Sequence, residues 1–288
     1  IYLAISHVWA DGMGNPRANS LPTCQIHKIQ TLANHLRKAP APTANLPIWI
    51  DTLSVPITKD GMARRKAIAR MNYIYENASV TLVLDAELMK QSMNADAVEL
   101  LMRIVHSRWS HRLWTFQEAS AAKYLVFRFS DGFVEFGVLK DAMVAYLAPS
   151  NMYDAVGIDL YRWAFTLEST PDPSQNLLKA FENASDRSTS RESDELICVA
   201  ALAGFNQEQM ETLLQSEPET RTKTFVQLLK RIPKNLIFVH LPTLPDRGFG
   251  WCPKRLIPAW KFIHVTLSDY DFFQLTPEGL RGQSAGLR

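Results

Sequence analysis

The first half of the chain alternates short apolar runs with segments in which apolar residues recur at helical spacing. Three of the runs are short and continuous enough to be buried strands, at 2–6, 48–51 and 79–84. Two more strands are expected at 124–129 and 133–136, on either side of a turn. Strands that alternate with helices in this way predict a parallel sheet that is covered by helices on both faces.

The helical segments between the strands have recognisable starting points. They begin near Pro22, Asp60, Asn94 and Ser110, and the last three of these residues are expected to cap their helices. The segment after Asp60 is expected to be one continuous helix, and the stretch before it, 52–59, a loop. In the second half, helices are expected at 137–147, 155–168, 174–184, 193–203, 207–215 and 219–232, with short β pieces at 259–267 and 272–275.

These patterns divide the chain into an α/β domain at 1–140 and a mostly helical region with short β pieces at 141–288. The hydrophobic content of 47% and the charged content of 21% are typical of a globular protein. A net charge of +2 does not indicate a nucleic-acid-binding protein. No apolar run is long enough to span a membrane. The chain starts inside a strand-like run without an initiator Met, so we expect it to be part of a longer protein.

The chain has three cysteines, Cys24, Cys198 and Cys252, which are far apart in the sequence. They form no CxxC pair and are odd in number, so they indicate neither a disulfide framework nor a zinc site. A reducing, cytoplasmic compartment is therefore expected.

Polar residues follow each of the first three strands. His7 and Trp9 come after the first, Asp51 ends the second, and Asp85 follows the third. Because ligands bind beyond the carboxyl ends of parallel strands, these side chains are expected to share one functional edge. Asp51 and Asp85 could hold a divalent metal there, although acids at strand ends commonly cap the next turn and we favour that interpretation.

Two other sites suggested by the sequence are weak or excluded. The loop DGMGN at 11–15 has glycines after a strand, but it is not GxGxxG and lacks the Lys of a P-loop. Ser6 and His7 are neighbours on a strand and must point to opposite faces, so they cannot form a nucleophile and its base.

The stretch 107–122, SRWSHRLWTFQEASAA, combines large aromatic side chains with basic residues and a carboxylate. Trp114 and Glu118 are four residues apart and share a helix face, and Gln117 lies beside them. A carboxylate beside an indole and near Arg112 is typical of a site that holds a charged group in apolar surroundings. The alternative is a core Trp and a surface Glu that pairs with an Arg.

Four segments together resemble the fungal heterokaryon-incompatibility (HET) domain: YLAISHVW, PIWIDTLSV, IARMNYIYENASVTLVL and RWSHRLWTFQEASAA. The matching residues are Ser6, Trp9, Trp49, Ile50, Asp51, Met71, Ile74, Tyr75, Ala78, Arg112, Trp114, Gln117 and Glu118. The later stretches STSRESDELICVAALAGF and GFGWCPKRL also look like segments found downstream of such domains. The chain departs from the family at His7, where Tyr is common, at 10–12, where Trp-Gly is usual, and at Ser54, where Cys is usual, and it has no following Gln.

HET domains are distantly similar to Toll/interleukin-1 receptor (TIR) domains, which implies a flavodoxin-like or TIR-like sandwich with an appended helical region. Enzymatic TIR domains cleave the nicotinamide–ribose bond of NAD+ with a helix Glu in a W-x-x-x-E arrangement, which Trp114 and Glu118 reproduce. The resemblance therefore implies that Glu118 is the catalytic carboxylate. It implies substrate contacts from Ser6, His7, Trp9, Asp51, Arg112, Trp114 and Gln117.

Nicotinamide leaves as a neutral molecule, so this cleavage needs no acid, and one carboxylate can stabilise the oxocarbenium-like transition state. The expected function is a fungal self/non-self recognition and cell-death effector that hydrolyses NAD+. NAD+ or a related nucleotide would be its substrate, without a further cofactor or metal, and the protein would self-associate. The alternatives are a non-enzymatic signalling or assembly module of TIR-like fold and a metal-dependent hydrolase that uses Asp51 and Asp85.

Overall fold

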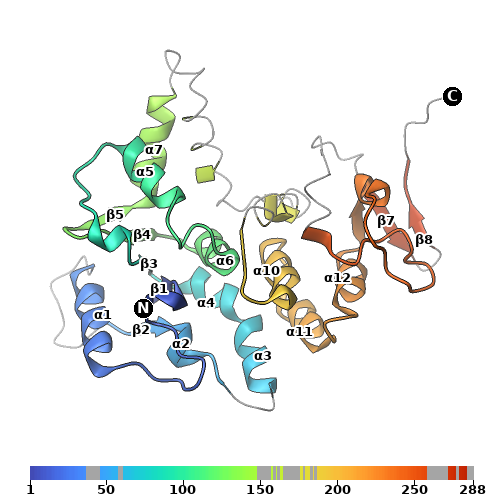
Figure 1. Cartoon of the computed structure of the whole chain (residues 1–288), viewed down its shortest axis with the longest axis horizontal. Helices are drawn as coiled ribbons and strands as arrows, with labels where there is room; N and C mark the ends of the chain where they lie inside the picture. Colours follow the sequence, from blue (N-terminus) through green and yellow to red (C-terminus); the bar gives the residue numbers. More distant parts are fainter. Residues whose placement is uncertain are drawn as a thin grey trace. The chain divides into compact units, whose positions relative to one another are not determined.

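The computed structural model describes residues 1–36, 46–57, 61–147, 187–257, 272–276 and 279–283, together with isolated positions between 157 and 184. Internal contacts divide the chain into two compact units, Ile1–Ser169 and Thr170–Arg288. The sequence predicts a different boundary, with the α/β domain at 1–140 and the mostly helical region at 141–288. Those domain bounds stay a prediction. Figure 1 labels helices and strands of both units.

The first unit is built on a five-stranded sheet. Its order is β2 (Ile48–Ile50), β1 (Leu3–His7), β3 (Val80–Leu84), β4 (Leu125–Arg128) and β5 (Phe133–Glu135). The first four strands of this order are parallel, and β5 forms an antiparallel hairpin with β4. The predicted α/β class with a mostly parallel sheet is confirmed. The strand order is one that flavodoxin-like sheets use, but β5 runs antiparallel, and the finer flavodoxin-like or TIR-like fold stays a prediction.

Helices connect and flank these strands. They are α1 (Thr23–His35), α2 (Asp51–Ser54), α3 (Met62–Ala69), α4 (Met71–Asn77), α5 (Ala97–Val105), α6 (Leu113–Ala121) and α7 (Phe136–Tyr146). Short 3₁₀ turns follow two of the strands, η1 at Trp9–Asp11 and η2 at Leu88–Lys90.

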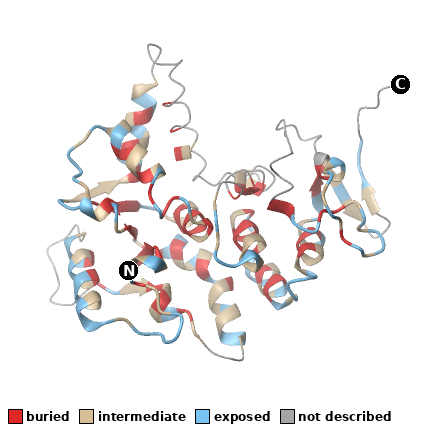
Figure 2. Ribbon diagram, in the orientation of Figure 1, coloured by how far each residue is buried: buried red, intermediate tan, exposed pale blue. Residues whose placement is uncertain are grey.

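The two faces of the sheet have separate cores. Alternate residues of a strand point to opposite faces, so Leu3 and Ile5 lie on one side and pack with Ile29 and Ala33 of α1. Ala4 lies on the other side, in a cluster with residues of α4 such as Tyr75. The helix α6 also packs on this second side, beside α4 and β1. Figure 2 shows the strands β1 and β3 and the helix α6 largely buried, whereas α1 is buried along one side only.

Several predicted helix boundaries are wrong. The helix after Asp60 is not continuous, because it breaks at Arg70 between α3 and α4, and Asp60 itself lies outside the described residues. The expected loop at 52–59 begins with the short helix α2. Asp96, and not Asn94, caps α5, because its carboxylate accepts from Glu99 N at 2.9 Å.

The cap expected for α6 is wrong as well. The helix starts at Leu113, and its N-cap is Arg112, which makes no side-chain capping bond. Ser110 belongs to the turn before the helix, where its backbone N–H donates to Ser107 Oγ at 3.2 Å. A serine in front of a segment with helical apolar spacing is typical of an N-cap. Here the serine instead forms part of the turn at 107–112.

The second unit combines helices with a small sheet. Its described elements are η3 (Glu192–Asp194), α10 (Glu195–Leu202), α11 (Gln207–Gln215), α12 (Arg221–Leu229), η4 (Lys234–Phe238), and the antiparallel strands β6 (Arg231–Pro233), β7 (Phe272–Thr276) and β8 (Gly279–Arg281). The prediction of a helix to residue 232 is wrong at its end, since Lys230 has a positive φ and β6 follows. The predicted helices 155–168 and 174–184 lie largely, and the β piece 259–267 entirely, outside the described residues.

Neither unit contains, in its described part, a helix that is long and apolar enough to cross a membrane. The second unit has its own core around Cys198, Leu213 and Phe225, each with no exposed surface. Phe205 stacks on Phe225 at a centroid distance of 5.3 Å and extends that core.

Candidate functional site

The carboxyl ends of β1 and β2 bring three of the predicted site residues together. His7 is the last residue of β1, Trp9 starts the turn η1, and Asp51 starts α2 directly after β2. His7 Nε2 lies 2.8 Å from Asp51 Oδ1, and Trp9 Nε1 donates to Asp51 Oδ2 at 2.6 Å. The prediction that these side chains share one edge of the sheet is confirmed.

Asp51 accepts more hydrogen bonds than those two. Its Oδ1 also accepts from the backbone N–H of Thr52 at 2.6 Å, whereas the Thr52 hydroxyl donates to the backbone oxygen of Met13 at 2.7 Å. Burial pushes the pKa of Asp51 up, but the bonds from His7, Trp9 and Thr52, together with the charge of His7, outweigh burial and the pKa is lowered. Asp51 is therefore a carboxylate at neutral pH.

Ser6 links the opposite face of β1 to helix α6. Its hydroxyl donates to Glu118 Oε2 at 2.5 Å, and its Oγ accepts from the indole N–H of Trp109 at 2.6 Å. Ser6, Glu118 and Trp109 are 0%, 5% and 1% exposed, so this chain of two hydrogen bonds lies almost wholly inside the protein. Ser6 and His7 point to opposite faces of the strand, as the alternation along a strand predicts.

The pKa of Glu118 is raised from 4.5 to about 7. Burial is the main cause, and the negative charge of Asp51 raises the pKa further. The hydrogen bond from Ser6 and the charges of His7 and Arg112 act in the opposite direction. Close to neutral pH, Glu118 can therefore carry a proton or a negative charge at little cost, which is a property of acid–base groups in enzymes.

Two neighbours complete the surroundings of Glu118. Arg112 Nη1 donates to the backbone oxygen of His7 at 3.2 Å, which ties the start of α6 to the end of β1. Tyr75, on α4, donates its hydroxyl to Ile5 O at 3.1 Å and is 1% exposed. Burial raises the pKa of Tyr75 well above its usual value, and the carboxylates of Glu118 and Asp51 raise it further.

The other two predicted contact residues point to α4. Trp114 packs against the apolar cluster that holds Ala4 and Tyr75. Gln117 is 1% exposed, and its Nε2 donates to Asn72 Oδ1 at 3.1 Å. The predicted contacts of Trp114 and Gln117 with a substrate stay predictions.

Asp85 has a structural role at the end of β3. Its Oδ1 accepts from the backbone N–H groups of Glu87 and Leu88 at 2.9 and 3.0 Å, and its Oδ2 accepts from Trp109 N at 3.0 Å. These bonds cap the turn that follows the strand, which is the interpretation that the sequence favoured. Among the residues that the structure describes, no group of three or more His, Cys, Asp or Glu could hold a metal ion.

Sequence reasoning missed the roles of Trp109, Thr52 and Tyr75. Nothing in the spacing of Trp109 shows that its indole N–H reaches a serine more than a hundred residues away. Thr52 has a local signal, because Asp-Thr at a helix start favours side-chain bonds to the backbone. Tyr75 is one of the residues that match the HET resemblance, but nothing in the sequence places its side chain beside Glu118.

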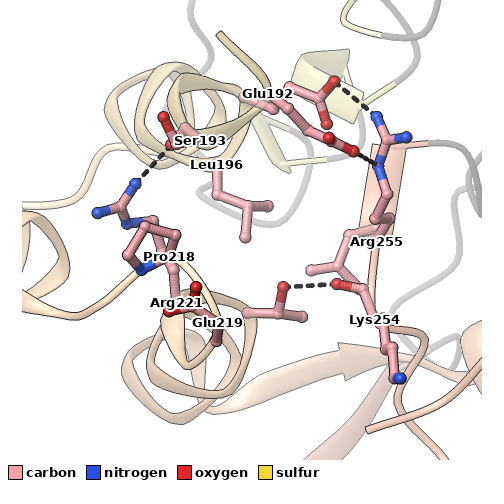
Figure 3. Close-up of a pocket in the computed structure, with 11 residues that line it drawn as sticks. Glu192, Ser193, Leu196, Pro218, Glu219, Arg221, Lys254 and Arg255 are labelled. Carbon is pink, nitrogen blue, oxygen red and sulfur yellow. Dashed lines mark hydrogen bonds and ion pairs between the residues drawn. The ribbon is translucent and has the colours of Figure 1, made fainter.

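In the second unit, the two downstream stretches of the resemblance meet at a cavity of about 290 Å³ (Figure 3). Arg255 forms ion pairs with Glu192 and, at 3.0 Å, with Glu195. Thr222 donates to the backbone oxygen of Lys254 at 2.8 Å, and Arg221 donates to that of Ser193 at 2.7 Å. These contacts join the segment 252–257 to the starts of α10 and α12.

The comparisons with known proteins give one family. Residues 2–96 match the family of the heterokaryon incompatibility protein (HET). The resemblance that three sequence segments suggested is thereby confirmed over this part of the chain, which contains Ser6, His7, Trp9 and Asp51. No curated protein and no solved structure matches the chain.

The HET match covers the sheet up to β3 and ends before α5. The fourth segment of the resemblance, with Arg112, Trp114 and Glu118, lies beyond it. In the structure, however, Glu118 and Arg112 each bond to the end of β1, inside the matched part. The HET segment and α6 thus contribute to one cluster of side chains.

Proposed function

We propose that the protein acts in heterokaryon incompatibility, as a fungal effector of self/non-self recognition and cell death. We further propose that it does so by cleaving the nicotinamide–ribose bond of NAD+ or a related nucleotide. The HET match supports the first part. The second part rests on a single observation, which is the buried Glu118 with a pKa of about 7, hydrogen-bonded to Ser6 near the carboxyl end of β1.

The chemistry needs one negative charge in the right place. The bond between ribose C1′ and the nicotinamide nitrogen breaks, and the nitrogen keeps the electron pair, so nicotinamide leaves as a neutral molecule. A carboxylate near C1′ stabilises the positive charge that develops on the sugar, and a water molecule then adds to C1′ and loses a proton. The ionised form of Glu118 would supply this charge, and the Ser6 hydroxyl would hold the carboxylate in place.

The location of the cluster also supports a ligand site. Ligands of open parallel sheets bind beyond the carboxyl ends of the strands, where neighbouring connections leave the sheet in opposite directions. β1 is such a point, because the next strand in sequence, β2, pairs with one edge of β1 and the strand after it, β3, pairs with the other edge. Asp51, with 19% of its side chain exposed, and the partly exposed Trp9 give this edge contact with solvent.

The rival function is a non-enzymatic signalling or assembly module of TIR-like fold. The observation in its favour is that Glu118 is only 5% exposed. In that interpretation the bonds from Ser6 to Glu118 and from Arg112 to His7 serve only to hold α6 against β1. Self-association, which we expect for either function, does not separate the two.

Nicotinamide release from NAD+ by the purified chain separates them. The wild type is compared with Glu118→Gln, which keeps the size of the side chain and removes its charge. Glu99→Gln is the matched control, because Glu99 is an exposed helix glutamate that pairs with Arg103. Release by the wild type and the control but not by Glu118→Gln would support the proposal, and release by no variant at high protein concentration would favour the rival.

The same assay tests the metal-dependent alternative. If Asp51 and Asp85 held a catalytic metal, a chelator would abolish release and a divalent cation would restore it. We expect release to be insensitive to the chelator, because Asp85 already accepts from three backbone N–H groups.

The proposed compartment is the cytoplasm. All three cysteines are free, with Cys24 exposed and Cys198 and Cys252 buried. Free thiols are typical of a reducing compartment and support this assignment.

A further inference from the structure

The imidazole of His7 uses only one of its two nitrogens. His7 is 4% exposed, and its Nε2 bonds to Asp51 Oδ1. Its Nδ1 is buried and has no hydrogen-bond partner among the described residues. The proposed reaction at Glu118 does not use this atom, so its state requires a separate explanation.

The surroundings of Asp51 decide where the imidazole carries its hydrogen. Asp51 is a carboxylate, since two donors besides His7 hold it, namely Trp9 Nε1 and Thr52 N. A carboxylate has no hydrogen to give, so the bond between His7 and Asp51 requires the hydrogen on His7 Nε2. In the neutral imidazole the other nitrogen, Nδ1, then has a lone pair and no hydrogen.

A buried acceptor without a partner is costly, and proteins leave few of them. The backbone carbonyl of His7, which accepts from Arg112, is itself an acceptor and cannot satisfy this lone pair. Nδ1 therefore lies ready for a donor that the described part of the chain does not supply. Its position at the end of β1, at the ligand-binding edge of the sheet, points to a ligand as the source of that donor.

We propose that His7 Nδ1 accepts a hydrogen bond from a hydroxyl group of the ligand, of the kind that the ribose of a nucleotide presents. Asp51 is the positioning residue that fixes the ring with its lone pair toward the ligand. The inference relies on the proposed function only for the identity of the ligand.

The state of the ring can be read directly from the nitrogen resonances of the full chain labelled with 15N-histidine. In the free protein we expect His7 to carry hydrogen on Nε2 only. Addition of NAD+, and in a second titration ADP-ribose, should move the Nδ1 resonance more than the Nε2 resonance, and should leave the exposed His27 unchanged. Hydrogen on Nδ1 in the free protein, or an Nδ1 resonance that neither nucleotide moves, would overturn the proposal.

Substitutions test the same contact by function. His7→Gln keeps a donor near the position of Nε2 but has no acceptor at Nδ1, whereas His7→Asn keeps a polar atom near Nδ1 and loses the donor to Asp51. We expect His7→Gln to raise the KM for NAD+ about tenfold with a smaller change in kcat, as the loss of one hydrogen bond predicts. His27→Gln should leave both constants unchanged, and an unchanged KM in His7→Gln would contradict the contact.

The two proposals can fail separately. If the nucleotides move Nδ1 but no nicotinamide is released, the contact of His7 stands and the cleavage does not. If Glu118-dependent release occurs while Nδ1 stays unmoved, the cleavage stands and the contact of His7 does not.

Discussion

Two carboxyl groups lie near the end of β1, and their pKa values are shifted in opposite directions. Asp51 is ionised because hydrogen bonds from His7, Trp9 and Thr52 outweigh its burial. Glu118 accepts a bond from Ser6, but burial together with the charge of Asp51 raises its pKa to about 7. Pairs of acids with separated pKa values commonly divide their tasks in enzyme sites. Here Asp51 positions a ring and Glu118 is the group whose charge can change.

The raised pKa of Glu118 makes the stability of the protein depend on pH. The folded state holds this proton more tightly than the unfolded chain, so the contribution is full below about pH 4.5 and is lost as the pH rises through about 7. A pKa of about 7 in place of 4.5 corresponds to about 3 kcal/mol. Glu118→Gln, which does not titrate, should gain about 2 to 3 kcal/mol relative to the wild type between pH 5 and pH 8.

Urea unfolding of both proteins at the two pH values measures this gain. Glu99→Gln again serves as the control, since its exposed carboxylate should change the difference between pH 5 and pH 8 only slightly. A difference between Glu118→Gln and the wild type that is the same at both pH values would contradict the raised pKa.

The hydroxyl of Ser6 is hydrogen-bonded to both Trp109 and Glu118, which are buried, and Ser6→Ala removes both hydrogen bonds. We expect a loss of about 1 to 3 kcal/mol in the free energy of unfolding, because buried polar groups that lose their partners keep their desolvation cost. The pKa of Glu118 should rise further, since the Ser6 bond lowers it. In urea unfolding, Ser20→Ala is the control at an exposed serine, and equal losses in the two variants would contradict a special role for Ser6.

Among the elements, the strands of the parallel sheet could be predicted from the sequence and several helix ends could not. β1 and β3 are buried on both faces and appear as continuous apolar runs, and such runs also place His7 and Asp51 at one edge. Helix starts failed where two candidate caps lie close together, as with Asn94 and Asp96. The bond from Ser6 to Glu118 could not be predicted from spacing, because packing of α6 against β1 brings the two together.

Helix α11 offers a clean test of a local signal. Asn206 and Gln209 form a capping box, in which each side chain bonds to the backbone N–H of the other. Asn206→Ala should therefore lower the free energy of unfolding by about 1 kcal/mol. Gln207→Ala, at the exposed next position, should change it by less than about 0.5 kcal/mol in the same urea experiment. Equal effects would show that the box contributes nothing.

On the scale of the whole molecule, each of the two compact units has its own core. The first is centred on the sheet with residues such as Leu82 and Phe127, and the second on helices with residues such as Cys198 and Phe225. Units with separate cores can open separately, since local stability follows local burial. The candidate site lies within the first unit, so its integrity should not depend on substitutions in the second.

Hydrogen exchange measured peptide by peptide tests this separation. Ser6→Ala should speed exchange in the strands of the first unit, and Asn206→Ala in α10 to α12 of the second. Each variant should leave the other unit unchanged, because each unit has its own core. Faster exchange throughout the chain in either variant would show that the two units open together.

The central claim is that the ionised form of Glu118 stabilises the charge that develops on the sugar. The most direct measurement is the rate of nicotinamide release from NAD+ between pH 5 and pH 9, for the wild type and Glu118→Gln. The rate of the wild type should rise through about pH 7 and level off, as the pKa of Glu118 predicts, and the variant should release at least a hundredfold less, on the order of what one electrostatic group contributes to catalysis. Equal rates in the two proteins, or no release by the wild type at any pH, would contradict the account.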